Sequence, residues 1–408
     1  MTTLLFTTSP SQDLVGQAAR LRELPALSPF DPSTVDFVSE FSRRILQLPE
    51  LRQFPELATL AHWFRPAAIE HLSRLLANGK DSDVTLARGL VFHLAPANVD
   101  VLFAYAWLMS MLSGNRNLAR LSQKPSAQRE ALIRILHAMQ ADGGHERALE
   151  RTVLLTYPHD DEITALLSRR CHARIIWGGD QTVAHIRSIP LAPLAVELAF
   201  PDRFGIAAFN ARCFADAREE ELAELARRFC NDTLWFGQQA CSSPRTVYWI
   251  GDEPTVEHAQ ARFWSQVHNA AASHDNEPAA LMARVTDAHL MAAQGIPLKL
   301  SGSLDQFPLR LSAPRADDKQ REQQSGHGLL VEVALPALSV LAAELDDRDQ
   351  TLVQHGFGPD ELRQLLSALS NRAIDRIVPL GRALDFHHVW DGTDLLGTLT
   401  RRIVCPAR

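Results

Sequence analysis

The chain has 408 residues, enough for two or three domains, and it can build a large core without disulfides or metal. Hydrophobic residues make up 46% and charged residues 22%, which excludes collagen-like and low-complexity chains. The 41 basic and 48 acidic residues give a net charge of 41 − 48 = −7, which argues against nucleic acid or an anionic membrane as the main partner.

The cysteines indicate a reduced, cytoplasmic protein. They are five in number and show no CxxC spacing: Cys171, Cys213, Cys230, Cys241 and Cys405. No disulfide framework and no metal site is therefore predicted. The N-terminus has no basic segment of the secretory type. The apolar run 101–112 is far below the roughly 18 to 20 residues of a membrane span, and we predict a buried helix there.

Residues 1–80 carry apolar residues at helical spacing and predict a helical front end. From residue 88 short apolar runs alternate with longer amphipathic ones, which predicts βαβ units and a mostly parallel sheet with helices on both faces. Further helices are expected over 215–235 and in two stretches within 254–295. The polar run 312–328 is predicted to be an exposed connection.

Familiar catalytic motifs are absent, since the sequence has no HExxH, no Walker A loop, no GxSxG and no GxGxxG. Cys241 lies in WFGQQACSSPRTV, where a helix runs out through small polar residues into a strand. A thiol in such a turn can be exposed and ionised, as a nucleophile must be. The alternative is a buried, unreactive cysteine, and Cys230 fits that description.

Two strand ends offer further candidates. Asn98, in HLAPAN, either caps the following helix or donates its side-chain amide to a developing oxyanion. Arg120 ends the stretch GNRNLAR, which is either an ordinary connection or a seat for a nucleotide phosphate. The residues alone leave both alternatives open.

Three elements follow one another along the chain: Pro96 and Asn98 at a strand end, Arg120 six positions after Gly114, and the turn with Cys241. Their order resembles the aldehyde dehydrogenase superfamily. The Cys-Ser-Ser run before a valine strand is more similar to the CoA-acylating reductases than to the aldehyde-oxidising enzymes. The chain most resembles the acyl-CoA reductase family of bacterial bioluminescence, the LuxC type. Similar segments extend over most of the chain, from Pro29-Phe30 through Trp177–Asp180 to Trp390–Gly392 and Arg401.

The resemblance implies an α/β fold of the aldehyde dehydrogenase type, with a Rossmann-type cofactor domain, a second α/β catalytic domain and a helical N-terminal segment. We expect the helices and the cofactor domain in 1–212 and the catalytic domain in 213–375. Residues 376–408 would return to the cofactor domain or cross to a neighbour in a homo-oligomer.

The implied reaction is NADPH-dependent reduction of a fatty acyl-CoA to the aldehyde. Cys241 would attack the thioester carbonyl and carry the acyl group, while Asn98 and the Cys241 backbone N–H would form the oxyanion hole. Two alternatives remain: a carrier-protein thioester as substrate, or a non-catalytic subunit of an acyl-transfer complex with transferase or synthetase partners.

The resemblance also implies a cofactor site. Arg120 falls where the superfamily usually has a lysine near the adenosine ribose, and Gln123 where NAD-preferring members often have a glutamate. With Ser122 beside them, this implies NADPH, and NADH is the alternative. Pro96 and the run Gly178-Gly179-Asp180 are expected to line the site, the glycines letting the chain pass close to the pyrophosphate or forming a plain turn.

The sequence departs from the superfamily at the segment whose glutamate activates water in the hydrolytic members. Here it reads VELAFP and lacks the glycines, so Glu197 is either that base or structural. A histidine could instead protonate the alkoxide, and His93, His327 and His355 are unranked candidates.

Overall fold

The computed structural model describes residues 2–11, 13–77, 83–96, 100–274 and 276–405. The chain divides into two compact units: unit 1 comprises residues 1–201 and 386–408, and unit 2 comprises residues 202–385. The mixed α/β fold with parallel sheets that the sequence predicted is confirmed. The expected boundaries of the catalytic domain, after residue 212 and before residue 376, both lie inside unit 2. One reason is that the strand over residues 204–210 pairs within the sheet of unit 2.

Unit 1 is built from the following elements: β1 (Thr3–Phe6), α1 (Leu14–Glu23), α2 (Pro32–Leu46), a 3-10 turn (Leu51–Gln53), α3 (Pro55–Trp63), α4 (Pro66–Ala77), β2 (Asp83–Ala87), β3 (Leu90–Leu94), α5 (Asp100–Leu112), β4 (Arg116–Arg120), α6 (Ala127–Asp142), α7 (Glu146–Leu149), β5 (Thr152–Thr156), α8 (Asp161–Ser168), β6 (Ala173–Trp177), α9 (Asp180–Ser188), β7 (Val196–Phe200), β15 (Val389–Trp390), β16 (Thr393–Asp394), α16 (Leu395–Thr398) and β17 (Thr400–Val404). The predicted helical front end is present as α1 to α4, preceded by the short strand β1.

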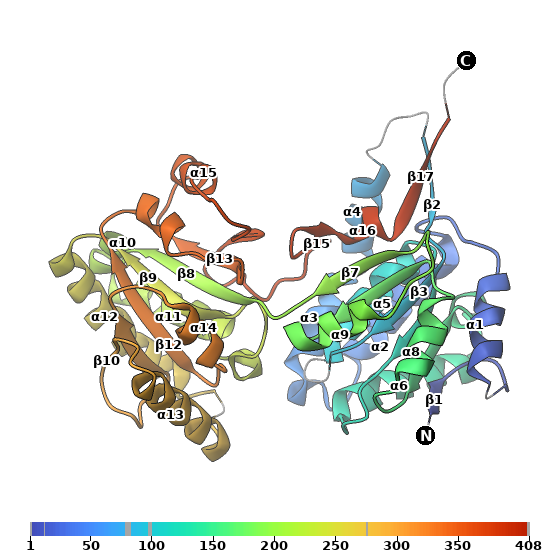
Figure 1. Ribbon diagram of the computed structural model, residues 1–408, viewed down its shortest axis with the longest axis horizontal. Helices are drawn as coiled ribbons and strands as arrows, with labels where there is room; N and C mark the ends of the chain where they lie inside the picture. Colours follow the sequence, from blue (N-terminus) through green and yellow to red (C-terminus); the bar gives the residue numbers. More distant parts are fainter. Residues whose placement is uncertain (1, 12, 78–82, 97–99, 275, 406–408) are drawn as a thin grey trace. The chain divides into compact units, whose positions relative to one another are not determined.

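The main sheet of unit 1 has the order β1-β5-β4-β3-β6-β7, in which β3 to β7 are parallel and β1 is antiparallel (Figure 1). The chain moves outward from β3 to β4 and β5 and then returns to the other side of β3 through β6. Such a reversal leaves a crevice at the carboxyl ends of the two central strands. The apolar run 101–112 forms α5, and Trp107 within it is 1% exposed, so the predicted buried helix is confirmed.

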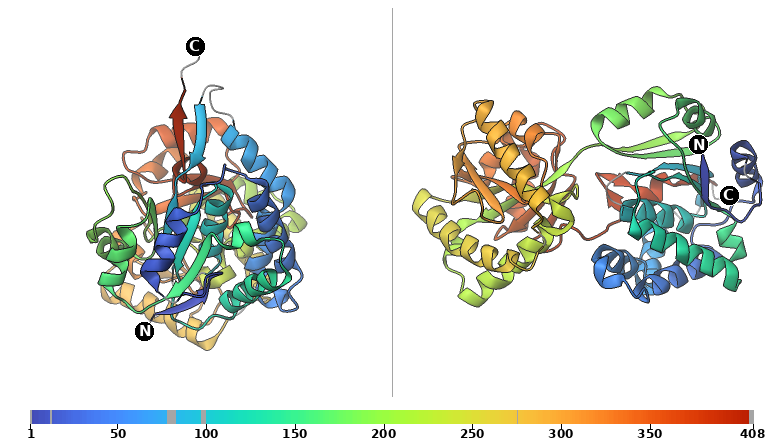
Figure 2. Two further views of the ribbon diagram at one scale, coloured as in Figure 1. Left: turned by 90° about the vertical axis from the view of Figure 1, so that its right-hand side faces the viewer. Right: turned by 90° about the horizontal axis from the view of Figure 1, so that it is seen from below.

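The last segment belongs to unit 1. There β17 pairs antiparallel with β2, and the two strands project together from the body of unit 1 (Figure 2). Residues 400–404 therefore contact a strand that lies more than 300 positions earlier in the sequence.

Unit 2 is built from a second set of elements: β8 (Phe204–Asn210), α10 (Ala211–Ala215), α11 (Glu219–Thr233), a 3-10 turn (Trp235–Gln238), β9 (Pro244–Ile250), α12 (Glu253–Ala271), α13 (Pro278–Ala293), β10 (Lys299–Leu300), β11 (Leu309–Ala313), α14 (Asp318–Gln323), β12 (Leu329–Leu335), a 3-10 turn (Leu338–Ala343), β13 (Asp349–His355), α15 (Pro359–Ser367) and β14 (Arg376–Pro379).

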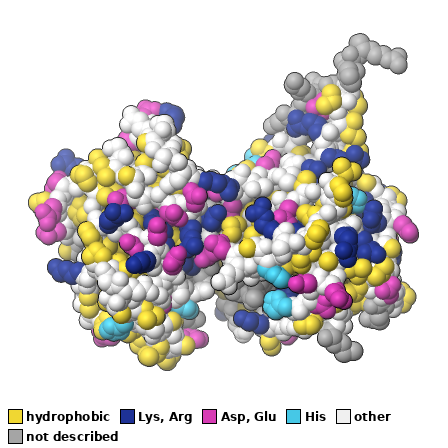
Figure 3. All heavy atoms as spheres, in the orientation of Figure 1, with side chains coloured by type: hydrophobic (Ala, Val, Ile, Leu, Met, Phe, Trp, Pro, Cys, Tyr) yellow, Lys and Arg dark blue, Asp and Glu magenta, His cyan; other side chains and the backbone are white. Residues whose placement is uncertain are grey.

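The sheet of unit 2 has the order β10-β11-β12-β9-β8-β13-β14 and is parallel except for β10. An aromatic cluster including Phe209, Trp249 and Phe263 fixes α10, α11 and α12 on one face. On the face shown in Figure 3, basic and acidic side chains lie among one another on both units. None of the helices within the described ranges combines the length and apolarity that crossing a membrane requires.

His93 lies in the middle of β3 and is 1% exposed. Its Nε2 is 2.9 Å from the side-chain oxygen of Asn117, and its Nδ1 is buried without a hydrogen-bond partner. Burial lowers the pKa of His93 to about 4, so the ring is neutral in the folded protein at neutral pH.

His93 takes up a proton more readily in the unfolded chain than in the folded protein. Its contribution to the free energy of unfolding is therefore fully present above its ordinary pKa of 6.5, and it is lost as the pH falls toward 4. Between pH 7.5 and pH 5 this loss should be about 2 kcal/mol. We expect His93→Gln, which can still donate to Asn117, to remove that part of the pH dependence. Urea denaturation of both proteins at the two pH values measures it, and an identical pH dependence would contradict the assignment.

Candidate active site

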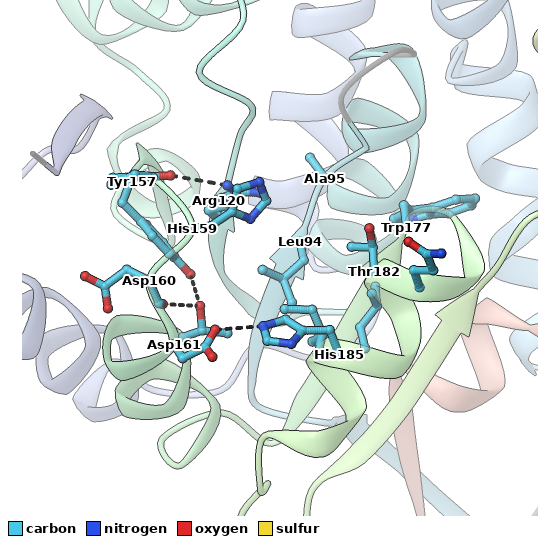
Figure 4. A pocket seen from close by; sticks show the side chains of 15 residues that line it. Leu94, Ala95, Arg120, Tyr157, His159, Asp160, Asp161, Trp177, Thr182 and His185 are labelled. Carbon is cyan, nitrogen blue, oxygen red and sulfur yellow. Dashed lines mark hydrogen bonds and ion pairs between the residues drawn. The ribbon is translucent and has the colours of Figure 1, made fainter.

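A pocket of about 220 Å³ opens at the carboxyl ends of β3, β4 and β6 in unit 1. Leu94, Arg120 and Trp177 line it from the strand ends, and residues of α8 and α9 complete it (Figure 4). This is the position at which sheets of this topology bind their ligands.

Arg120 is the basic group of this pocket. Its Nη2 donates to the carbonyl oxygen of Tyr157 at 3.2 Å, and the guanidinium carbon lies 5.3 Å from the centre of the Tyr157 ring. Its Nε is buried without a hydrogen-bond partner. Within the described ranges no carboxylate forms an ion pair with Arg120, so the guanidinium keeps donors for an anionic ligand.

The two acids of the pocket are already engaged. Asp160 caps α8, because its side chain accepts a hydrogen bond from the Ile163 amide at 3.0 Å. Asp161 pairs with His185 of α9 at 2.8 Å, as the dashed line in Figure 4 marks.

The glycine turn precedes α9. Gly179 is the residue that caps α9, and a Cβ atom placed on it would meet no atom within 4 Å, whereas one on Gly178 would lie 3.1 Å from Thr182. Asp180 is the first residue of α9. The open space at Gly179, the first amides of α9 and the unused donor of Arg120 fit a dinucleotide, whose pyrophosphate suits a helix N-terminus.

Other predicted cofactor residues have different positions. Pro96 is buried just after β3, and Gln123 is exposed. The Ser122 hydroxyl accepts a hydrogen bond from the Lys124 amide at 3.2 Å. None of these three lines the pocket. Asn98 lies outside the described residues.

Glu197 belongs to an ion-pair network on β6 and β7. Its carboxylate accepts from Arg174 Nε at 2.7 Å and from Arg187 Nε at 3.1 Å. It is the second residue of β7 and lies opposite Arg174 in the register, about 10 Å before the carboxyl edge of the sheet. Since Arg174 is 1% exposed, the pair neutralises a buried charge, and we leave Glu197 out of the proposed mechanism.

The three histidines also lie in different places. His93 is enclosed in the sheet of unit 1. His355 ends β13 and packs against Phe214, at the carboxyl edge of the unit 2 sheet. His327 precedes β12 and contacts the cysteine loop, because its amide donates to the Gly237 carbonyl at 2.8 Å and its Nε2 is 3.2 Å from Gln239 Nε2.

The cysteine loop, residues 236–243, lies at the amino edge of the unit 2 sheet, directly before β9. Cys241 is half-buried, in a turn closed by a 3.0 Å hydrogen bond from the Ser243 amide to the Ala240 carbonyl. Phe236 and Gln238 have positive φ values of 56° and 63°, which are unfavourable for residues other than glycine. Such a backbone persists only where the surroundings hold it.

Gln238 supplies much of that hold. It is fully buried, its Nε2 donates to the carbonyls of Pro244 at 2.8 Å and Leu329 at 3.0 Å, and its Oε1 accepts from the Gly328 amide at 2.9 Å. Gln239 adds a 2.7 Å bond to the Ser325 carbonyl. The cysteine loop is thus tied to residues 324–329.

The prediction that 312–328 is an exposed connection is therefore wrong for part of this stretch, although Arg315, Asp318, Lys319 and Glu322 are exposed. This stretch contains α14, and Gln320, Arg321 and Gln324 within it are at most 5% exposed. Its buried polar residues form hydrogen bonds with partners inside unit 2, although the polar sequence pattern predicts contact with water.

Arg245 follows the cysteine loop at the start of β9 and is 8% exposed. Its Nη1 donates to the Gln324 carbonyl at 2.7 Å, its guanidinium lies 5.2 Å from the Phe204 ring centre, and none of the described carboxylates forms an ion pair with it. Burial lowers the pKa of Arg245, while Asp202 and an ionised Cys241 raise it. The attraction is mutual, so Arg245 favours the thiolate form of Cys241. No sequence motif predicts this role, because the partners of a buried arginine are decided by the tertiary packing.

Over the described residues no group of three or more His, Cys, Asp or Glu side chains could hold a metal ion.

Comparison with known structures places the fold. The NAD-dependent aldehyde dehydrogenase of Sinorhizobium meliloti superimposes with a TM-score of 0.66 at 14% identity, over 89% of this chain and 78% of that one. The glyceraldehyde-3-phosphate dehydrogenase of Methanocaldococcus jannaschii, solved with NADP, gives 0.64 at 11% identity, over 96% and 93%. The fold is therefore that of the aldehyde dehydrogenases, and it does not by itself distinguish between the two cofactors.

Sequence comparison adds the family. The long-chain acyl-protein thioester reductase of Aliivibrio fischeri is 25% identical over 170 residues, which are 40% of this chain and 33% of that protein. The chain thus matches about a third of the length of this relative. The family model described as acyl-CoA reductase (LuxC) matches residues 57–295, more than half of the chain. The protein belongs to the acyl-CoA reductase (LuxC) family.

Proposed function

We propose that the protein reduces an acyl thioester, a fatty acyl-CoA, to the aldehyde through an acyl group carried on Cys241. The observation that carries this proposal is a half-buried thiol held in a fixed loop beside a buried arginine. Membership of the acyl-CoA reductase family supports it.

In the proposed mechanism the Cys241 thiolate, favoured by Arg245, attacks the thioester carbonyl and forms a new carbon–sulfur bond. Asn98 and the Cys241 backbone N–H would donate to the oxyanion, where one such donor is worth roughly 2.7–4 kcal/mol. Collapse expels the carrier thiolate, which takes a proton, and leaves an acyl-cysteine. We assign proton transfer to His327, because it contacts the cysteine loop.

A nicotinamide cofactor, when bound, supplies the hydride that reduces the acyl carbon. The carbon–sulfur bond to Cys241 then breaks, the aldehyde leaves and the thiolate is restored. Arg120 would hold the cofactor from the pocket. Pro96, Ser122, Gln123 and Gly178–Asp180 do not line the pocket and would contact parts of the cofactor that extend beyond it. We propose NADPH over NADH, because Arg120 has unused donors while Asp160 and Asp161 have other partners.

The thioester carrier can be CoA or a carrier protein, since the reacting bond is the same. We favour CoA as the simplest donor, and NADPH consumption with acyl-CoA against acyl-carrier protein separates the two. A non-catalytic role beside transferase or synthetase partners is the remaining alternative.

We further propose a cytoplasmic homo-oligomer. The ribbon formed by β2 and β17 has only two strands and exposes Val84, Ile403 and Val404. Two isolated strands are marginally stable in water, so a second copy of the chain is the proposed cover.

Incubation with an acyl-CoA radiolabelled in the acyl group tests the nucleophile. The unchanged protein should trap label, and Cys241→Ala should trap none and lose roughly 10³-fold or more in reductase activity. Cys213→Ala, which removes another half-buried thiol of unit 2, is the matched control and should keep the label. Equal labelling of both variants, or no labelling of the unchanged protein, would refute the mechanism and favour the non-catalytic role.

Gln238→Leu tests the hold on the loop. The substitution leaves the Gly328 amide and the Pro244 carbonyl unpaired and should destabilise unit 2 by at least about 2 kcal/mol. The acylation rate of Cys241 should fall as well. Gln364→Leu, on the exposed face of α15, should stay within about 0.5 kcal/mol. A Gln238→Leu protein with unchanged acylation would show that the loop needs no such hold.

Arg120→Glu tests the cofactor preference. Since a 2′-phosphate would meet a negative charge, the ratio of kcat/KM for NADPH to that for NADH should fall at least about tenfold. Arg169→Glu reverses an exposed charge in the same unit and should leave the ratio unchanged. An unaltered ratio in Arg120→Glu would remove Arg120 from the cofactor site.

A further inference from the structure

The sheet of unit 2 carries a second cavity, on the face that packs against α12. It is open and polar, has a volume of about 710 Å³, and lies between α12 and the strands β10, β11 and β12. None of its lining residues belongs to the cysteine loop or to the pocket of unit 1. Its volume is within the range of small-molecule sites.

The floor of this cavity is Glu332 of β12, which is 2% exposed. Its Oε1 accepts from Trp249 Nε1 at 2.9 Å, Trp264 Nε1 at 2.6 Å and Gln260 Nε2 at 3.1 Å. Its Oε2 pairs with Arg310 Nη1 at 3.0 Å. Four donors thus satisfy the carboxylate, and it has little capacity left to bind a cation.

Arg310 is held in one orientation. Glu332 fixes its Nη1, and the guanidinium carbon lies 4.8 Å from the ring centre of Trp264. The Nε is buried without a partner, and the Glu332 bond is the one hydrogen bond that the guanidinium of Arg310 forms to a described residue. A guanidinium has five donors, so most of them remain for a ligand.

The rest of the lining adds positive charge and neutral donors. Lys299 of β10 lines the cavity and is exposed, and Ser301, two residues later in the sequence, lines it as well. His268 of α12 has a buried Nε2 without a partner; burial and the charge of Arg310 lower its pKa, so the ring is neutral at neutral pH. Apart from the satisfied Glu332, the one acid in the lining is the exposed Glu257.

We propose that this cavity binds a phosphate group, with Arg310 and Lys299 as its charged contacts. A rigid guanidinium presents paired donors to two phosphate oxygens, and the ammonium supplies a second positive charge. The volume leaves room for an organic group beyond the phosphate. The source is either the 3′-phosphate of CoA, which rests on the proposed function, or free inorganic phosphate.

Binding to the full chain can be measured by calorimetry and by tryptophan fluorescence, to which Trp264 contributes from beside Arg310. The probes are inorganic phosphate, CoA and 3′-dephospho-CoA. Arg310→Lys keeps the charge but loses the paired donors, and we expect about tenfold weaker phosphate binding. Lys299→Ala should weaken it as well, whereas Lys319→Ala, which removes another exposed lysine of unit 2, should not.

Phosphate affinities unchanged in both Arg310→Lys and Lys299→Ala would overturn the proposal. If Arg310→Lys fails to fold, the exposed Lys299 carries the test. Tighter binding of CoA than of dephospho-CoA supports the carrier as the source, and equal binding of the two with phosphate still bound supports free phosphate. Acylation of Cys241 from an S-acyl-N-acetylcysteamine thioester, which has no phosphate, tests the proposed function separately and should not change in Lys299→Ala.

Discussion

The side-chain amide of Gln238 is the interaction on which the candidate site of unit 2 depends. It ties the cysteine loop to the beginnings of β9 and β12 through three hydrogen bonds. Without these bonds the positive φ values at Phe236 and Gln238 would relax, and the position of Cys241 would change with them. The buried amide thus fixes the conformation of the loop, as a disulfide or a bound metal does in other proteins. Such an interaction suits a chain that is predicted to work in a reducing environment.

Arginine supplies most of the buried positive charge, and its partners decide what each residue can do. Arg174 and Arg321 are neutralised by Glu197 and Asp349, which makes these pairs part of the framework. Arg245 is also buried but forms no ion pair with a described carboxylate, and its charge interacts with Asp202, Cys241 and Asp287. Arg310 is intermediate, because Glu332 fixes it through one nitrogen and leaves other donors for a ligand.

The direction of the parallel strands also distinguishes structural residues from candidate functional residues. In unit 1 Arg120 and Trp177 stand at the carboxyl ends of parallel strands, where both line the pocket. Glu197 pairs with Arg174 in the strand register and lies nearer the amino edge of the sheet. In the sequence, however, it follows soon after residues that line the pocket. In unit 2 the cysteine loop and His327 share the amino edge, and His355 is at the other.

The sequence by itself determined the fold class, the buried α5 and the family, because hydrophobic periodicity and the order of short motifs are local properties that survive in one dimension. It also indicated Cys241 and Arg120 as candidates. Only the tertiary structure showed where each of the three histidines lies and that Glu197 forms an ion pair. It also showed that part of the polar stretch 312–328 packs inside unit 2. These outcomes depend on which groups burial brings together. A polar or charged residue in the sequence does not reveal whether water, a carboxylate or a backbone carbonyl will satisfy it.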